Sequence, residues 1–119
     1  MKEALIIEDK TIVIKMTDAE DMDSLKDFGN SLLVKLKNGI GVLGAVADKP
    51  MLVVVVTDTL IEAGIKAGDL AKQIGSIMGG GGGRPSLATA GGKDQKSLET
   101  AMEKAKDIIL KNIEEKNAV

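Results

Sequence analysis

The apolar run Met51–Val56 is the feature that most constrains how this chain can fold. Its six consecutive residues include no polar side chain. Because successive side chains of a strand point to opposite faces, such a run leaves neither face for water. Strands of this kind lie inside sheets that helices cover on both sides. The run therefore predicts a layered fold with this strand near its centre.

The other predicted strands surround this run in the sequence. The β-branched segment Thr11–Thr17 alternates as a strand does, and residues 4–7 fit the other arm of a hairpin with it. Residues 40–47 form a strand joined to the apolar run by Ala47-Asp48-Lys49-Pro50, a connection short enough only for antiparallel neighbours. A short strand over residues 86–90 follows the second predicted helix.

Three helices are predicted between and after these strands. The first begins after the acidic cluster Asp18–Asp23, which caps it, and stops at Asn38-Gly39. Its apolar face consists of Met22, Leu25, Phe28, Leu32, Leu33 and Leu36. The second covers residues 66–78, and the third covers residues 94–115 with Asp94 as its N-cap. The order β-α-β-β-α-β-α predicts an α/β (α+β) fold with a mixed sheet and helices packed on it.

Composition excludes several classes of chemistry. The chain of 119 residues is long enough for a single domain, residues 1–119, and it contains no His and no Cys. Zinc sites built on these residues, disulfides, thiol nucleophiles and Ser-His-Asp triads are therefore absent. The single aromatic residue, Phe28, argues against binding of single strands by stacking on aromatic platforms. We expect neither catalytic residues nor a metal site.

Charge is unevenly distributed along the chain. The formal net charge is −2, yet residues 66–96 hold five basic residues against two acidic ones. This basic window contains Arg84, the one arginine, together with Lys66, Lys72, Lys93 and Lys96. No apolar stretch approaches the ~20 residues of a membrane span, and no signal peptide pattern opens the chain. The sequence thus predicts a cytoplasmic protein without a membrane partner.

The glycine cluster is the strongest candidate for a site. Seven glycines occur in the fourteen positions from Gly79 to Gly92, with Arg84-Pro85 among them. Each glycine costs more backbone entropy on folding than any other residue, so the cluster needs a reason. Positive φ angles, close approach of a ligand, or a row of amides that bind an anion would each supply one. A flexible turn that lets two elements pack closely is the structural alternative.

Other motifs point to structure rather than to chemistry. No Gly-Lys-Ser or Gly-Lys-Thr of a Walker loop is present. The sequence G-x-G-x-x-G at residues 39–44 follows a helix and opens a strand, the reverse of a dinucleotide site, so close packing explains it better. The acidic cluster lacks the spacing of a calcium loop. Asp58 and Asp69 fit helix starts, and Met22, Met51, Met78 and Met102 fall at core positions.

The string GGGGGRPSLATAGGKD at residues 79–94 resembles the glycine-rich signature of the DHHA1 domain, in the form that closes the C-terminal domain of alanyl-tRNA synthetases. In that form Gly-Gly-x-Gly-Gly-Gly-Arg-Pro precedes a strand of small residues, a Gly-Gly pair and a Lys-Asp helix start. The resemblance includes Ala67-Gly68-Asp69-Leu70 and most of the chain from about Ile40 onward, while the first forty residues match only in pattern. Related DHH-family phosphoesterases often have a His after the glycines, where this chain has Arg84.

This resemblance implies an accessory, tRNA-binding domain of a larger synthetase. The family's domain binds the outer corner of the L-shaped tRNA and helps one tRNA reach both the aminoacylation and the editing site. It implies no cofactor in this chain, since ATP, magnesium and zinc would serve other parts of the parent alanine–tRNA ligase. The expected partners are tRNA, specifically tRNA-Ala, and the other domains of the parent enzyme.

Both lines of reasoning lead to one predicted surface. The backbone N–H groups of Gly79, Gly80, Gly81, Gly82 and Gly83 would contact tRNA with Arg84, Lys93 and Lys96, and Lys72 would widen the patch. Three alternatives stay open. One is a dimerisation or interaction module that uses the C-terminal helix or a sheet edge. The second is the nucleic-acid-binding domain of a DHH-family phosphoesterase, and the third is a nucleotide or phosphate sensor at the glycines.

Overall fold

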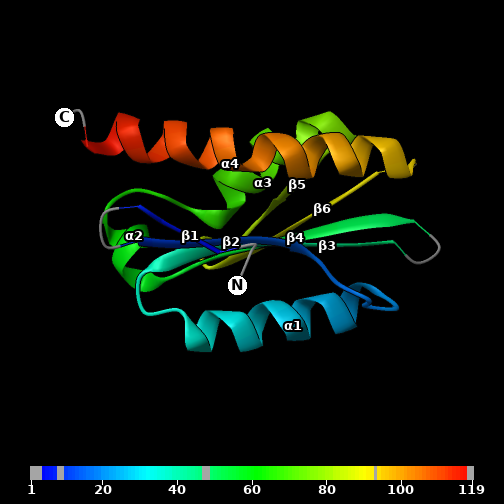
Figure 1. Cartoon of the computed structure of the whole chain (residues 1–119), viewed down its shortest axis with the longest axis horizontal. Helices are drawn as coiled ribbons and strands as arrows, with labels where there is room; N and C mark the ends of the chain where they lie inside the picture. The colour runs from blue at the N-terminus through cyan, green and yellow to red at the C-terminus, as the bar shows by residue number, and fades with distance from the viewer. Residues whose placement is uncertain (1–3, 8–9, 47–48, 93, 118–119) are drawn as a thin grey trace.

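Six strands form one mixed sheet, and helices lie against both of its faces (Figure 1). The structure is a computed structural model, and it describes residues 4–7, 10–46, 49–92 and 94–117. The strands are β1 (Ala4–Ile7), β2 (Lys10–Met16), β3 (Gly39–Val46), β4 (Pro50–Val56), β5 (Gly81–Gly83) and β6 (Leu87–Gly91). Their order across the sheet is β1-β2-β3-β4-β6-β5, so β1 and β5 are the two edges.

Only β2 and β3 are parallel; all other neighbours are antiparallel. A parallel pair needs a crossover connection, which helix α1 (Met22–Lys35) supplies. The remaining helices are α2 (Asp58–Glu62), α3 (Ala67–Met78) and α4 (Gln95–Asn117). Helices α3 and α4 lie on one face of the sheet and α1 on the other (Figure 1). The predicted fold class and the predicted β3–β4 hairpin are confirmed.

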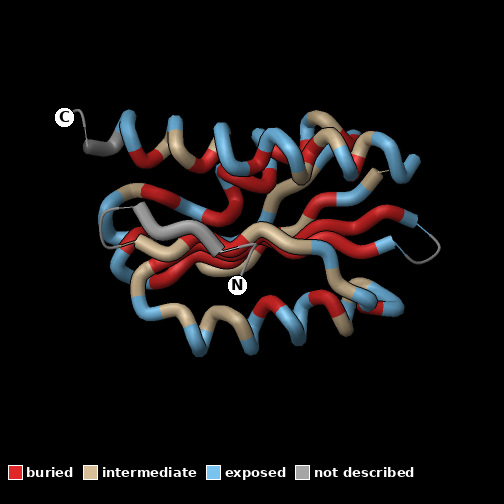
Figure 2. The backbone as a smooth tube through the Cα atoms, viewed as in Figure 1, coloured by how far each residue is buried: buried red, intermediate tan, exposed pale blue. Residues whose placement is uncertain are grey.

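The core consists of two apolar layers on either side of the sheet (Figure 2). Every residue of β4 is buried, as its unbroken apolar sequence predicts. Glycines bring α1 close to the sheet, because a Cβ on Gly41 would collide with the Leu32 side chain and one on Gly29 would lie 3.2 Å from Val55 Cγ1. The G-x-G-x-x-G segment is therefore a packed strand and no dinucleotide loop.

Several predicted boundaries differ from the structure. Helix α1 ends at Lys35 instead of Asn38, because Leu36 is already extended, with ψ of 128°. Helix α2 has only 5 residues and was not predicted, since a segment this short shows no helical periodicity. Part of the glycine run forms β5, although strands rarely contain consecutive glycines. Backbone pairing with β6 holds this segment as a strand. Glycines have no side chains, so the sequence pattern there could not predict it.

Phe28 is the clearest error in the predicted core. The helical spacing places it with Leu25, which is indeed fully buried, but Phe28 keeps 41% of its surface exposed. Gly29, next along the helix, takes the place closest to β4. The methionines fit their predicted positions, since Met51 and Met78 are buried while Met22 and Met102 pack against the core.

Candidate nucleic-acid interface

The glycine cluster folds into a hairpin at one edge of the sheet. Strand β5 pairs with β6 in antiparallel register, and Arg84-Pro85-Ser86 makes the turn between them. Arg84 N donates to Leu87 O at 3.0 Å, which closes the turn. The N–H of Ala67, the first residue of α3, donates to Pro85 O at 2.7 Å, so the start of α3 is fixed beside the turn.

Backbone conformation explains three of the glycines in this run. Gly79, Gly80 and Gly83 have φ angles of 143°, 150° and 155°, which side-chain-bearing residues rarely adopt. Gly79 ends α3, and its N–H donates to Gly75 O at 2.8 Å, as does the N–H of Gly80. Gly79 and Gly80 turn the chain from the helix back into the sheet, and Gly83 lies at the other end of β5.

Close packing of α3 explains a fourth. A Cβ on Gly81 would lie 2.5 Å from Ala71 O of α3, which is backbone and cannot move aside. Helix α3 contributes glycines of its own, because a Cβ on Gly68 would lie 2.6 Å from Gly83 O. Helix and strand thus approach each other along surfaces that have almost no side chains. This is the structural alternative that the sequence left open.

Within the run Gly79–Gly83, Gly82 is the glycine that neither reason explains; elsewhere in the cluster Gly91 is a second one, since an added Cβ there would lie 3.9 Å from Pro50 O. The φ of Gly82 is not in the positive range, and the nearest atoms to an added Cβ would be Lys72 Cε at 3.8 Å and Lys72 Cγ at 4.0 Å. Its partner across the hairpin is Thr89, whose neighbours Ala88 and Ala90 belong to the core on the α3 side. Gly82 and Thr89 therefore lie on the opposite face. Helix α1 packs on β3 and β4, so the Lys72 side chain from α3 is the nearest cover that Gly82 has in the described part of the chain.

The amides of the glycine run divide into two groups. Those of Gly79 and Gly80 are used by Gly75 O, so the expectation that all five face a ligand is wrong. Gly80 O accepts from Gly91 N at 3.3 Å and Arg84 N donates to Leu87 O. Because antiparallel bonds alternate along a strand, the amides of Gly81 and Gly83 point away from β6, toward the free edge.

The predicted basic residues are only partly brought together. Arg84 is exposed at the turn, and the Lys72 side chain runs beside Gly82. Lys66, the residue before α3, is also exposed next to the turn. The basic window of the sequence includes Lys66, but only the contact between Ala67 and Pro85 shows that it belongs with Arg84.

Lys96 is separated from this group. It lies in the first turn of α4, which follows Gly92 at the opposite end of the hairpin. Arg84 is four residue steps along the strand from the Gly80–Gly91 pair, or roughly 13 Å. Lys93 lies outside the described residues. We therefore define the hairpin surface as Gly81, Gly82, Gly83 and Arg84 with Lys66 and Lys72.

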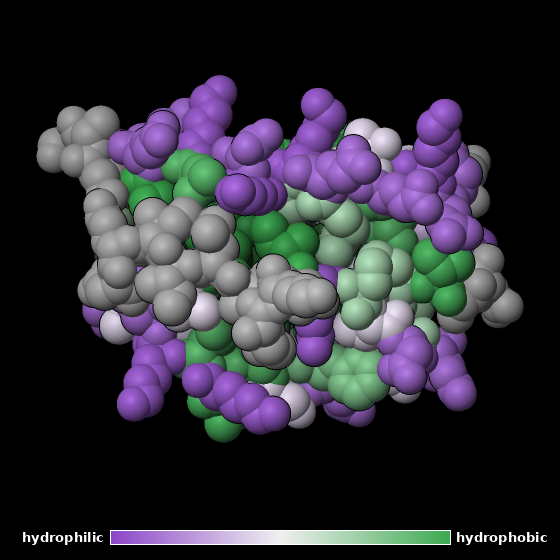
Figure 3. Space-filling model, viewed as in Figure 1, coloured by the Kyte–Doolittle hydropathy of each residue, from purple (hydrophilic) through white to green (hydrophobic). Residues whose placement is uncertain are grey.

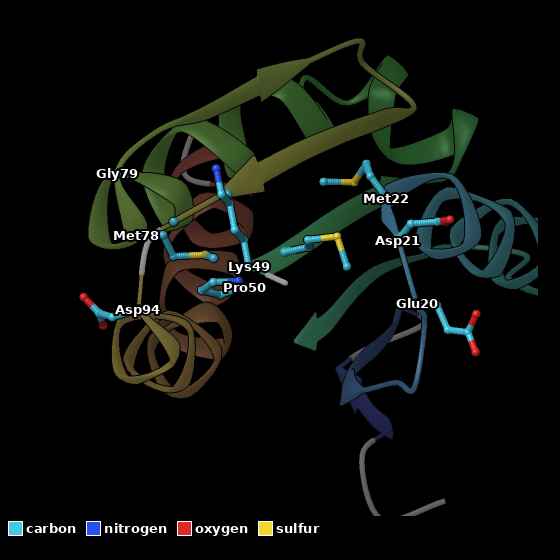
Figure 4. A pocket seen from close by; sticks show the side chains of 11 residues that line it. Glu20, Asp21, Met22, Lys49, Pro50, Met78, Gly79 and Asp94 are labelled. Carbon is cyan, nitrogen blue, oxygen red and sulfur yellow. The ribbon is translucent and has the colours of Figure 1, made fainter. Parts of the chain in front are cut away.

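The other end of the hairpin opens on a groove of about 770 Å³ (Figure 4). Met22 and Met78 point toward each other across it, from α1 and α3. The acidic residues Glu20, Asp21 and Asp94 stand at its rim with Lys49 as the one base. This rim disfavours phosphate, which is a further reason to place an anion at the Arg84 end.

The acidic residues have structural roles. Asp21 caps α1 by accepting from Ser24 N at 2.8 Å, and this hydrogen bond lowers the pKa of the Asp21 carboxyl. Asp94 accepts from Ser97 N at 2.8 Å, which confirms its predicted capping role. Asp58 and Asp69 lie in the first turns of α2 and α3. Within the described ranges, no three potential ligands gather to hold a metal ion.

Comparison with known proteins gives the family. The DHHA1 domain family matches residues 8–111, so the match extends well before Ile40, where the sequence resemblance begins. The alanine–tRNA ligase of Alkaliphilus oremlandii (strain OhILAs) is 32% identical over 95% of this chain and 13% of its own length. That of Salinibacter ruber (strain DSM 13855 / M31) is 42% identical over 78% of this chain and 10% of its own.

A solved structure shares the fold. The C-Ala domain of Aquifex aeolicus alanyl-tRNA synthetase superposes with a TM-score of 0.76 at 23% identity, over 88% of this chain and 96% of that one. This chain therefore spans about one eighth of the ligases it matches and nearly the whole of the solved domain. It belongs to the DHHA1 domain family, in the form that alanyl-tRNA synthetases carry as their C-terminal domain.

Proposed function

We propose that this domain binds the elbow of tRNA-Ala through the hairpin surface and so helps one tRNA serve both the aminoacylation and the editing site of its parent enzyme. Gly82 is the observation that carries the proposal. The fold does not require glycine there, because the φ angle is ordinary and an added Cβ would meet nothing closer than Lys72 Cε at 3.8 Å. As a glycine, the residue has no side chain of its own to keep a ligand away from its backbone. Glycine at such a position is typical of close approach by a ligand.

The residues around Gly82 suit a nucleic-acid backbone. The amides of Gly81 and Gly83 can donate to phosphate oxygens, and Arg84 supplies a planar fork for a phosphate or a base edge. Lys66, next to the turn, and Lys72, beside Gly82, add positive charge. A surface with so few cations neutralises few phosphates, so we expect modest, salt-sensitive affinity.

The chemistry of the parent enzyme would lie elsewhere. We propose that this domain has no catalytic site, that ATP, magnesium and zinc serve other domains, and that the protein acts in the cytoplasm with those domains as partners. None of the described helices is both long enough and apolar enough to cross a membrane. The named relatives are alanine–tRNA ligases, which supports this role over that of a phosphoesterase domain.

Binding of tRNA-Ala by two variants tests the proposal. Gly82→Val suits a strand but covers the backbone, so we expect affinity to fall about tenfold with no loss of stability. Arg84→Ala should weaken binding and reduce the slope of log affinity against log salt by about 1, since one phosphate contact is lost. Filter binding at several salt concentrations measures both effects.

Lys96→Ala is the matched control, because it removes a cation at the far end of the hairpin. It should bind nearly as well as the wild type. A tRNA with a disrupted elbow should bind the wild type as weakly as Gly82→Val binds intact tRNA. Equal affinity of the wild type and Gly82→Val for intact tRNA would exclude the hairpin surface as the contact.

A further inference from the structure

A second groove lies between α1 and β2, on the face of the sheet that α1 partly covers. It has a volume of about 510 Å³ and is lined by Phe28, Leu32 and Lys35 from α1 and by Lys15 and Met16 from β2. Figure 3 shows apolar surface reaching the outside next to α1, among hydrophilic side chains. The volume is within the range of small-molecule sites.

Phe28 gives this groove an exposed aromatic ring. Phe28 is 41% exposed, although it is a large apolar side chain that the core could bury. Leu32 and Leu43 supply the apolar floor. A planar ring held between a helix and a strand offers one face for stacking, and stacking on Phe tolerates any nucleobase.

Two lysines flank the ring from different elements. Lys35 lies two turns along α1 from Phe28, and Lys15 projects from β2 on the other side of the groove. Asp18 is the one acidic residue in the lining. An aromatic platform with a cation on either side matches a nucleotide, whose base stacks while its phosphate meets an ammonium group.

This groove is distinct from the hairpin surface. Strand β2 is separated from β5 by β3, β4 and β6, which corresponds to about 19 Å across the sheet. We propose that the groove between α1 and β2 binds a nucleotide, with the base on Phe28 and the phosphate between Lys15 and Lys35. The nucleotide is either free or an unpaired residue of an RNA strand.

Proton NMR tests this directly, because Phe28 is the one aromatic residue of a chain without Tyr, Trp or His. In exchanged D2O its ring protons are the protein's sole aromatic signals. Titration with adenosine 5′-monophosphate should shift them upfield and saturate, while ribose 5-phosphate should leave them unchanged. Tetraadenylate binding more tightly than the mononucleotide would assign an RNA strand; equal affinity would assign a free nucleotide.

Charge variants test the role of the lysines. Lys15→Gln and Lys35→Gln should each weaken adenosine 5′-monophosphate binding about two- to fivefold. Lys26→Gln is the matched control, since Lys26 is exposed on α1 and is absent from the groove lining. Phe28→Leu keeps an apolar side chain and should weaken binding at least about fivefold, as followed by saturation transfer to the adenine protons.

Two results would overturn the proposal. One is a Phe28 ring signal that does not move through millimolar adenosine 5′-monophosphate. The other is an equal effect of Lys26→Gln and Lys35→Gln. Arg84→Ala should leave the nucleotide-induced shift of the Phe28 ring protons unchanged. The ring shift therefore tests the groove between α1 and β2, while tRNA binding tests the hairpin surface.

Discussion

At the scale of single residues, adjacent glycines in β5 serve different purposes. Gly81 must be glycine because the backbone of α3 lies against it, whereas an added Cβ on Gly82 would make only ordinary contact with the Lys72 side chain, at 3.8 Å. Composition cannot distinguish the two, because the sequence shows five identical residues in a row. The distinction becomes visible only when the atoms around each Cα are known.

Alanine substitutions should separate these two roles. Gly81→Ala places a Cβ 2.5 Å from Ala71 O, so α3 and β5 must move apart and stability should fall by about 1–3 kcal/mol. Gly82→Ala meets its nearest atom at 3.8 Å and should cost nothing measurable. Urea unfolding gives both values. Equal destabilisation by the two variants would mean that packing against α3 does not determine the cost of replacing a glycine in β5.

The cap of α1 gives a pH-dependent prediction. The hydrogen bond from Ser24 N lowers the pKa of Asp21, so the charged carboxylate stabilises the native state above the ordinary pKa of an aspartate. This contribution is lost as the pH falls through the lowered pKa. Asp21→Ala should therefore lower the Tm by a few degrees at pH 7, with a difference that shrinks below about pH 4.

Asp21→Asn is the matched control, because asparagine also caps helices but does not titrate. Its Tm should stay near that of the wild type at pH 7. Thermal unfolding at several pH values measures all three proteins. A Tm difference between Asp21→Ala and the wild type that is the same at pH 3 and pH 7 would contradict the role given to the charge.

At the scale of elements, α4 is fixed by one apolar stripe. Leu98, Ala101, Ala105 and Ile109 are fully buried, while the charged residues between them face outward. These residues follow one another at intervals of three or four positions, the spacing of one helical face. The contrast with α1 is instructive, since Phe28 has the right spacing yet lies outside the core because one helix covers only part of its face of the sheet.

Truncation of Ile109 measures how firmly α4 is held. Ile109→Ala removes buried atoms from the layer between α4 and the sheet and should destabilise the domain by about 2–5 kcal/mol. Lys106→Ala, on the exposed side of the same helix, should change stability by less than about 0.5 kcal/mol. Chemical denaturation distinguishes these outcomes, and a small loss for Ile109→Ala would indicate that α4 packs loosely.

At the scale of the whole molecule, the faces and edges of the sheet differ in whether they could pair with a second copy of the chain. The apolar stripe of α4 is used within the domain, so the dimerisation alternative cannot use this stripe without unfolding that layer. We expect a monomer near the chain mass of 12.4 kDa at tens of micromolar. Sedimentation equilibrium measures this, and a mass of twice that value would support the dimerisation alternative through a sheet edge.

The sequence alone determined the layered architecture and the family. The unbroken apolar run requires cover on both faces, helical stripes supply that cover, and the glycine string with Arg84 identifies the signature. These features are local, so they can be read along the chain. Only the tertiary structure showed which glycines are required by packing and which are not. It also showed that Lys66 and Arg84 are neighbours while Lys96 is distant, and that Phe28 is exposed. Each depends on which element packs on which, and contacts between distant segments leave no periodic trace in a single sequence.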